Sequence, residues 1–283
     1  MKAIISHDID HITVWEHLFR DTIIPKYMAR MHIELSTGKI SLREYILRWA
    51  DFFKNKWQNI DELVTFNNIN NVPSSFFIAV NKGLGLNYSP KNALLWIDQM
   101  KCRKCEINIH GIEFESFSAI KEEHLQFESI TKNKNFGIRM HYVRNNSETL
   151  LNLSKAGYSF DSTEHAFKNP YKIGEMWEFP FQIMDGWIIE NGKKWQSTNL
   201  NTAKENTLKI IDKAFKNNIN YLGIDFHDRY FSHSFKTWLD WYMWLIEYLK
   251  QNKVEFVNFE NAILALENKI TMSSEMLNKP TSF

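Results

Sequence analysis

MKAIISHDID, residues 1–10, begins as an apolar run and ends in a cluster of ionisable side chains, His7, Asp8 and Asp10. α/β enzymes often hold reactive groups at the C-terminal end of a buried strand, because the strand is fixed in the core and its end is open to a ligand. Residues two apart share a face of a strand, so Asp8 and Asp10 should point the same way and Ile9 into the packing. Two carboxylates in one small space raise each other's pKa unless a cation intervenes, so a metal ion or an arginine is predicted beside them. The alternative is a strand-end turn in which the aspartates cap backbone amides.

Strand-like and helix-like segments alternate along the rest of the chain. Further strands are expected at 74–80, 106–110, 136–140, 158–161, 176–181, 221–227 and 254–259. Helices are expected at 41–57, 90–100, 115–133, 147–157, 202–218 and 235–251. This alternation predicts an α/β fold with a mostly parallel sheet of seven or eight strands, closed or nearly closed into a (β/α) barrel.

The length of the chain, 283 residues, suits one large domain, which we expect at 1–270. The stretch at about 11–70 is expected to be a helical insertion over one end of this domain, with Ser41 and Glu44 as a capping box. Residues 271–283 are expected to form a loose tail.

Composition and charge exclude several classes of partner. The net charge is +1, from 34 basic and 33 acidic residues, so no strong field favours nucleic acid or an anionic membrane. No apolar run approaches the roughly 18 residues of a membrane span. The first strand starts at residue 3 and leaves no room for a signal peptide, which predicts a cytoplasmic protein.

The cysteines and the aromatic residues give weaker signals. Cys102 and Cys105 form a lone CxxC, and without a second pair we interpret them as reduced, packed thiols rather than a zinc site. The aromatic share is 14%, and aromatic side chains in loops suit sugar stacking, although most such rings pack in the core. Trp187, Trp195 and Tyr230 lie in loop-like stretches and are the candidate sugar platforms.

Ionisable residues recur where the predicted strands end. Because the C-terminal ends of parallel barrel strands meet at one face, these residues should share a site. They are Asp8 and Asp10, His110, His141, Asp161 and His227.

Six short motifs, taken in chain order, resemble those of the polysaccharide deacetylases, the NodB-homology carbohydrate esterases. They are SHDID at 6–10, SSFFIAV at 74–80, IHGIE at 109–113, GIRMHY at 137–142, FDST at 160–163 and FHD at 226–228. The resemblance implies a distorted (β/α) barrel and a metal-dependent hydrolase that removes an N-acetyl or similar acyl group from an amino sugar or its precursor. It also implies a divalent cation, most simply zinc, with cobalt, manganese or nickel as alternatives.

By this resemblance, Asp8 would be the general base and Arg139 the group that orients it. Asp10 and His110 would be metal ligands, and His227 the general acid that protonates the departing amine.

Two departures from the family's pattern concern the metal site. Ile9 separates two aspartates that are consecutive in the family, so the roles of base and ligand could be exchanged. Phe114 stands where the family has a second histidine ligand. His141 is the candidate replacement and Glu113 a weaker one. If neither reaches the metal, the chain would be a degenerate, non-catalytic carbohydrate-binding member.

The remaining site residues would contact the substrate. Tyr142, through a nearby backbone N–H, would help to hold the oxyanion, and Trp187 would stack on sugar. Asp161 could bind substrate hydroxyls or cap the following turn. Asp225 could hold the ring of His227.

The expected partner is a saccharide, or a nucleotide- or lipid-linked sugar, handled in surface-polysaccharide biosynthesis. A metal-dependent hydrolase of other C–N or ester bonds is a further alternative, because metal, base and acid do not specify the acyl group.

Overall fold

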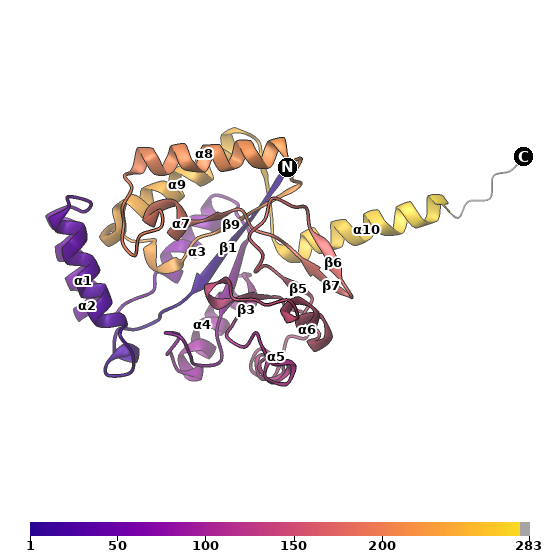
Figure 1. Cartoon of the computed structure of the whole chain (residues 1–283), viewed down its shortest axis with the longest axis horizontal. Coiled ribbons are helices and arrows are strands. Elements are labelled where there is room, and N and C mark those ends of the chain that lie inside the picture. The colour runs from indigo at the N-terminus through magenta and orange to yellow at the C-terminus, as the bar shows by residue number, and fades with distance from the viewer. Residues whose placement is uncertain (278–283) are drawn as a thin grey trace, which may run out of the picture.

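The fold centres on one ten-stranded sheet that curls into a distorted barrel (Figure 1). The computed structural model describes the backbone of residues 1–277 and the side chains of residues 1–270. The strand order is β6-β7-β5-β4-β3-β2-β1-β9-β8, with β10 also paired to β1, and every pair is parallel except β6 with β7. The strands are β1 (Lys2–Ile9), β2 (Ser74–Ile78), β3 (Glu106–Gly111), β4 (Ile138–Met140), β5 (Phe160–Asp161), β6 (Tyr171–Ile173), β7 (Met176–Glu178), β8 (Ile183–Met184), β9 (Tyr221–Asp225) and β10 (Glu255–Val257).

One continuous segment joins the two sides of the barrel. β7 pairs with β5, and a few residues later β8 pairs with β9. Between these strands the Phe179 N–H still donates to the carbonyl of Asp161 (2.8 Å), and the Gln182 N–H donates to the carbonyl of Gly223 (2.9 Å). The segment 176–184 therefore bridges β5 and β9, and the sheet closes through it.

The predicted fold class, an α/β barrel, is confirmed. All eight expected strands are present, as β1 to β5, β7, β9 and β10. The structure adds β6 and β8, which are three and two residues long. Pairings so short leave no alternating pattern in the sequence, which is why ten strands are found where seven or eight were predicted.

Helices surround the sheet (Figure 1), and several of their ends were predicted from local signals. Ser41 and Glu44 form the predicted capping box at the start of α2, and Gly157, at φ 99°, ends α6 in the left-handed conformation that glycine tolerates. The helices are α1 (Ile23–Ser36), α2 (Leu42–Phe53), α3 (Ile60–Ile69), α4 (Pro90–Cys102), α5 (Phe117–Thr131), α6 (Thr149–Ala156), α7 (Asp185–Glu190), α8 (Leu200–Lys216), α9 (Lys236–Gln251) and α10 (Phe259–Leu277). Four single 3₁₀ turns are η1 (Trp15–His17), η2 (His141–Val143), η3 (Asp228–Tyr230) and η4 (His233–Phe235).

The stretch predicted as a helical insertion contains α1, α2 and α3. In Figure 1, α1 and α2 stand at the end of the sheet toward which β1 points, and α10 projects from the opposite end. The segment predicted as a loose tail, 271–283, begins inside α10, and 278–283 lie outside the described residues. The single-domain boundary at 1–270 stays a prediction. Along the described chain, no helix combines the length and apolarity needed to cross a membrane.

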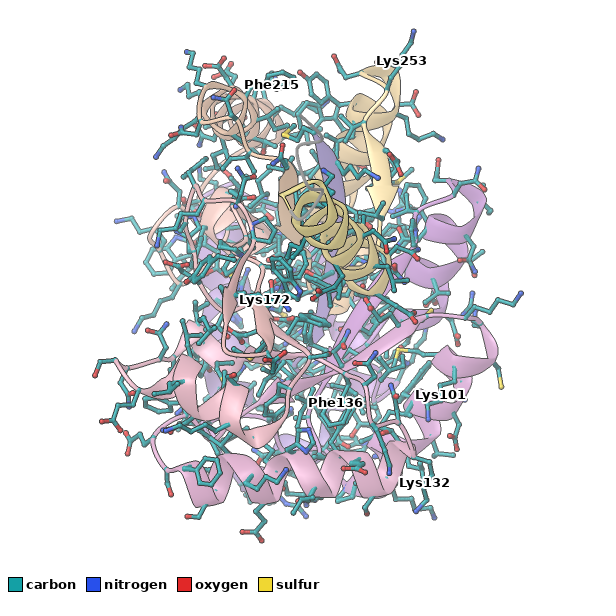
Figure 2. The ribbon with its side chains drawn as sticks, turned by 90° about the vertical axis from the view of Figure 1, so that its right-hand side faces the viewer. Lys101, Lys132, Phe136, Lys172, Phe215 and Lys253 are labelled. Atoms are coloured by element: carbon teal, nitrogen blue, oxygen red, sulfur yellow. The ribbon has the colours of Figure 1, made fainter. Side chains whose placement is uncertain are left out.

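The core lies between the sheet and its helices. β1 is buried from Ala3 onward, and in Figure 2 Phe136 lies inside the molecule whereas Phe215 lies at its edge on α8, with exposed fractions of 2% and 64%. Cys102 and Cys105 are free thiols as predicted, but Cys102 is exposed rather than packed.

A buried ion pair holds α1 against α2. Arg48 on α2 pairs with Glu34 on α1, both side chains are 0% exposed, and Arg48 Nε also donates to the carbonyl of Ser234 (2.8 Å). Arg48→Met removes one of the two arginines that compensate the buried Glu34, the other being Arg30 (2.9 Å), so it is expected to lower the free energy of unfolding by about 3 kcal/mol, the low end for breaking a buried ion pair. Urea denaturation measures this. Arg43→Met, at an exposed position of the same helix, should change it by less than about 0.5 kcal/mol; equal effects would contradict the interpretation.

Candidate active site

The two aspartates of the first strand face the same side at its C-terminal end, as predicted. Ile9 between them is fully buried, Asp8 is 3% exposed, and the Asp10 side chain is 23% exposed. Asp8 thus lies in the interior and Asp10 at the mouth of the barrel. The carboxylates therefore share a space but have different neighbours.

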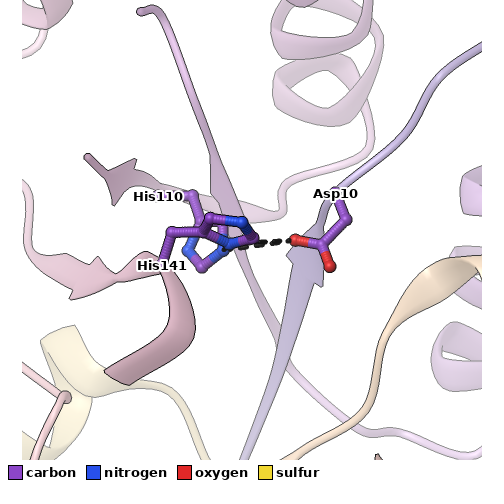
Figure 3. Close-up of side chains that lie close together, drawn as sticks. All are labelled: Asp10, His110 and His141. Carbon is purple, nitrogen blue, oxygen red and sulfur yellow. Dashed lines mark hydrogen bonds and ion pairs between the residues drawn. The ribbon is translucent and has the colours of Figure 1, made fainter. Parts of the chain in front are cut away.

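Asp10, His110 and His141 form a compact cluster (Figure 3). Asp10 Oδ1 lies 3.3 Å from His110 Nε2 and 3.5 Å from His141 Nδ1, and the two ring nitrogens are 2.9 Å apart. His110 lies near the end of β3, and His141 is the first residue after β4. Because β3 and β4 are adjacent and parallel, the two rings lie side by side.

The hydrogen bonds on the far sides of the two rings select one tautomer of each neutral imidazole. His110 Nδ1 donates to the carbonyl of Arg139 (3.1 Å), and His141 Nε2 donates to the carbonyl of Leu84 (3.3 Å). A carbonyl can only accept, so the facing atoms, His110 Nε2 and His141 Nδ1, are left with lone pairs. Asp10 Oδ1 is buried and receives no hydrogen bond from the described residues. Three acceptors that face one another repel unless a cation or a shared proton lies between them.

The donor set fits a divalent transition metal. Zinc–ligand bonds of about 2.0–2.1 Å in a tetrahedron place ligand atoms roughly 3.3 Å apart, close to the separations of 2.9 to 3.5 Å in this cluster. Two imidazoles and a carboxylate are also ligands that zinc accepts while keeping an open position. His141, the candidate replacement for the family's second histidine ligand, thus lies within ligand distance of Asp10 and His110. Glu113 is not part of the cluster, and Phe114 packs under the guanidinium of Arg144, 4.8 Å from its ring centre.

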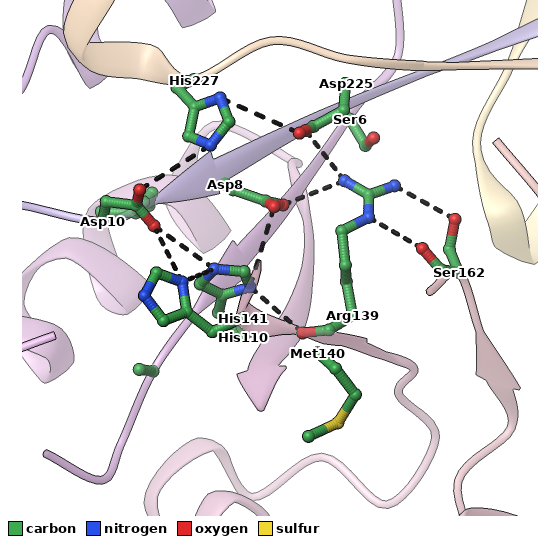
Figure 4. Close-up of polar contacts among 12 residues, drawn as sticks. Ser6, Asp8, Asp10, His110, Arg139, Met140, His141, Ser162, Asp225 and His227 are labelled. Carbon is green, nitrogen blue, oxygen red and sulfur yellow. Dashed lines mark hydrogen bonds and ion pairs between the residues drawn. The ribbon is translucent and has the colours of Figure 1, made fainter. Parts of the chain in front are cut away.

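Beside this cluster, Arg139 links the carboxylates of Asp8 and Asp225 (Figure 4). Its Nη1 donates to Asp8 Oδ1 (2.9 Å) and to Asp225 Oδ1 (2.8 Å). Its Nε and Nη2 are held by the carbonyl and hydroxyl of Ser162 (2.9 and 3.1 Å). Only 1% of the arginine is exposed, so the guanidinium is a fixed positive charge beside Asp8, as predicted from the strand-end pattern.

This arrangement sets the protonation states at neutral pH. Burial alone would raise the pKa of Asp8, but the charge of Arg139, with that of His227, lowers it overall. Burial would lower the pKa of His227, but Asp185 and Asp225 raise it well above its ordinary value. Burial and the charge of Asp8 raise the pKa of Asp225 to about 7. Asp8 is therefore a carboxylate ready to accept a proton, and His227 an imidazolium ready to give one.

Asp185, rather than Asp225, holds the ring of His227. Asp185 Oδ1 lies 2.8 Å from His227 Nδ1, and its Oδ2 accepts the His227 backbone N–H at 2.8 Å. Asp225 Oδ2 is 3.9 Å from that ring, and its other oxygen binds Arg139. Sequence reasoning missed Asp185 because it follows β8, a two-residue strand with no pattern of its own.

Asp161, which was predicted to contact the substrate, lies in the interior of the protein. It is 0% exposed, and its two oxygens accept hydrogen bonds from the hydroxyl and the N–H of Thr163 (2.6 and 3.0 Å). A fully buried carboxylate that is already satisfied cannot reach a sugar. The structure therefore corrects the substrate-binding assignment and matches the alternative, a cap on the turn after β5.

Tyr142 and Trp187 are both placed at the cluster. A small cavity of about 170 Å³ is lined by these two residues and by Asp8, Asp10, His110, Met140, His141, Val143, Met184 and His227. Trp187 is 44% exposed and stacks on Phe181, with ring centres 5.4 Å apart. Both predicted contact residues therefore border the space in front of the candidate ligands.

The backbone beside the cluster is strained. Tyr142 and Val143 have φ of 58° and 55°, a region that is unfavourable for any side chain and most of all for a β-branched one. Such strain concentrates at functional sites, where the surrounding structure over-determines the backbone. It turns Tyr142 across His141, with ring centres 3.9 Å apart.

Comparison with known proteins rests on structure, because no protein-family model matches the chain and no curated protein matches it significantly in sequence. A Mycobacterium smegmatis protein assigned to the polysaccharide deacetylases superimposes with a TM-score of 0.62, at 12% identity over 95% of this chain and 91% of that one. A second protein so assigned, from Pseudomonas aeruginosa PAO1, gives a TM-score of 0.55 at 15% identity, over 72% and 71% of the chains. The allantoinase PuuE gives 0.57 at 10% identity, over 92% and 87%. This chain therefore has the distorted (β/α) barrel fold of the polysaccharide deacetylases.

Proposed function

We propose that this chain is a metal-dependent hydrolase of the polysaccharide deacetylase family that removes an N-acetyl or similar acyl group from an amino sugar or a sugar precursor. The observation that carries the proposal is the convergence of three devices at one end of the barrel: the cluster of Asp10, His110 and His141, the Asp8–Arg139 pair, and the His227–Asp185 pair. The fold neighbours, which include polysaccharide deacetylases, are consistent with it.

Asp10, His110 and His141 would hold the cation, which when bound supplies Lewis-acid polarisation of a carbonyl oxygen. Asp8 accepts the proton of the attacking water, and Arg139 keeps its carboxylate ionised and aimed. The alternative, with Asp8 as the metal ligand and Asp10 as the base, is less compatible with this geometry. Asp10 Oδ1 has no hydrogen-bond partner among the described residues, whereas Asp8 Oδ1 accepts a hydrogen bond from Arg139.

His227 donates a proton to the departing amine. Its Nδ1–H is held by Asp185, so Nε2 is the atom that faces the cluster, 3.7 Å from Asp10 Oδ2. Tyr142 and Trp187 border the same space and would position the acylated sugar, with a backbone N–H near Tyr142 assisting the oxyanion.

The direct test is acetate release from N-acetylated amino sugars by zinc-reconstituted protein, with and without a chelator. We expect release that the chelator abolishes and zinc restores. Saccharide binding that is indifferent to the chelator, with no acetate release, would instead support the non-catalytic carbohydrate-binding alternative. Cell fractionation would test the sequence-based prediction of a cytoplasmic protein of surface-polysaccharide biosynthesis.

A second candidate function is hydrolysis of a different C–N or ester bond. It is favoured by the allantoinase among proteins of the same fold and by the fact that cation, base and acid do not define the acyl group. A substrate panel that includes allantoin and simple acyl esters separates the two candidates, since only the first requires an acylated amino sugar.

Asp185→Asn tests Asp185 as a positioning residue. Losing the charge that orients His227 and keeps its ring protonated should lower kcat on an N-acetyl sugar about 100-fold, within the range for general acid catalysis. An aryl acetate has a leaving group that needs no proton, so its hydrolysis should fall less than about threefold. Equal losses on both substrates would indicate a merely structural role.

A further inference from the structure

A second, larger cavity adjoins the metal-ligand cluster. Its volume is about 420 Å³, within the range of sites for small ligands, and it shares Asp10, His141 and Tyr142 with the small cavity. Trp195 and Tyr230, two of the predicted sugar platforms, also line it. A substrate whose acyl group reaches the cluster would therefore extend into this space.

The charge of its wall is one-sided. The described side chains that line the cavity include four cations, and Asp10, a candidate metal ligand, is the one carboxylate among them. The cations come from three separate segments of the chain and are Lys26, Arg30, Lys194 and Arg229.

Helix α1 contributes Lys26 and Arg30, one turn apart on the same face. Lys26 is exposed. Arg30 is held by Glu34 (2.9 Å) and Glu190 (2.8 Å), while its buried Nη2 has no hydrogen-bond partner among the described residues. The helix that follows β1 therefore presents one flexible and one fixed cation to the cavity.

Arg229 is the most telling of the four. Its guanidinium lies 4.7 Å from the ring centre of Tyr27 and 4.2 Å from that of Trp57. Its Nε and Nη2 are buried without a hydrogen-bond partner, and none of the ion pairs among the described residues involves it. Burial lowers the pKa of this arginine. This half-buried cation has aromatic faces beside it but no counter-ion among the described residues, and an anion in the cavity would supply one.

We propose, resting on the deacetylase function above, that this cavity binds a phosphate group carried by the acylated sugar, as in a sugar phosphate or a nucleotide- or lipid-linked sugar diphosphate. Guanidinium forks and ammonium groups around one space match the several oxygens and the charge of a phosphate or diphosphate. In this proposal the segment 11–70 contributes to substrate binding, because α1 forms one wall of the cavity. The neutral N-acetyl sugar alone would leave Arg229 without a counter-ion among the described residues.

Calorimetry on zinc-reconstituted protein tests this with four probes: N-acetylglucosamine, its 1-phosphate, UDP-N-acetylglucosamine, and the uronic acid analogue, which carries a carboxylate instead. The phosphate-bearing probes should bind at least about tenfold more tightly than the neutral sugar. Lys26→Glu and Lys194→Glu should each weaken their binding about 10- to 100-fold and leave binding of the neutral sugar unchanged. Lys193→Glu is the matched control, because Lys193 is exposed and adjacent but is not among the lining residues.

Equal affinity for neutral and phosphorylated sugars would overturn the inference. So would preference for the carboxylate analogue, or a loss in Lys193→Glu as large as in Lys194→Glu, which would indicate only a diffuse surface field. Analysis of the recovered sugars for a free amine tests the deacetylase function separately: phosphate-dependent binding without loss of acetate would reject that function and keep the anion site.

Discussion

Replacing Asp8 by asparagine is expected to lower kcat/KM for deacetylation about 1,000-fold, within the range attributed to a positioned general base. The amide has nearly the same shape as the carboxylate but cannot accept the proton of water. The fold should persist, because Arg139 keeps its bonds to Asp225 and Ser162. Steady-state kinetics on the best N-acetyl sugar of the panel measures the effect.

Metal content distinguishes this explanation from the exchange of roles between the two aspartates. Asp8→Asn should retain its zinc, whereas Asp10→Asn should lose it. The reverse pattern would make Asp8 the ligand. Asp98→Asn, at an exposed position of α4, is the control and should match the unchanged protein in both activity and zinc content.

Replacing His141 by alanine is expected to weaken zinc binding by more than about 100-fold, because losing a direct ligand should exceed the 10- to 100-fold typical of outer-shell changes. The physical reason is the lone pair on Nδ1, which faces His110 Nε2 at 2.9 Å. Competition with a chromogenic chelator measures the affinity, and activity should fall with it.

The control for this prediction is His233→Ala, since His233 is an exposed histidine outside the cluster. It should bind zinc as the unchanged protein does. If His141→Ala also kept its zinc, the third ligand would have to be a different group. His141 would then not replace the histidine ligand that the family has at the position of Phe114.

Much of the site was predictable because strand alternation is a local rule. Asp8 and Asp10 are two residues apart, so they share a face whatever the remaining fold is. His110 and His141 each stand at the end of a short predicted strand, and in a parallel sheet the ends of neighbouring strands converge. The roles assigned to them came from resemblance to a family, and these stay predictions until the variants above are measured.

Other parts of the site had no local signal. Asp185 sits after a strand of two residues, and it was identified only when His227 was found 2.8 Å away. Asp161 lies at the end of a strand just as His110 does, but its carboxylate is buried against Thr163. Position at a strand end was the same for both residues, and the packing around each end separated a site residue from a cap.

Local patterns in the sequence were enough to predict the barrel, the strand ends that carry ionisable groups, and the helices of 11–70, because periodicity, caps and turns act over a few residues. Three relations came from the packing of the whole chain: the pairing of Asp185 with His227, the ring nitrogens that face one another, and the cavity that Lys26, Arg30, Lys194 and Arg229 surround. These are relations between side chains far apart in the chain. Their distances depend on how every intervening element packs, and no short stretch of sequence records them.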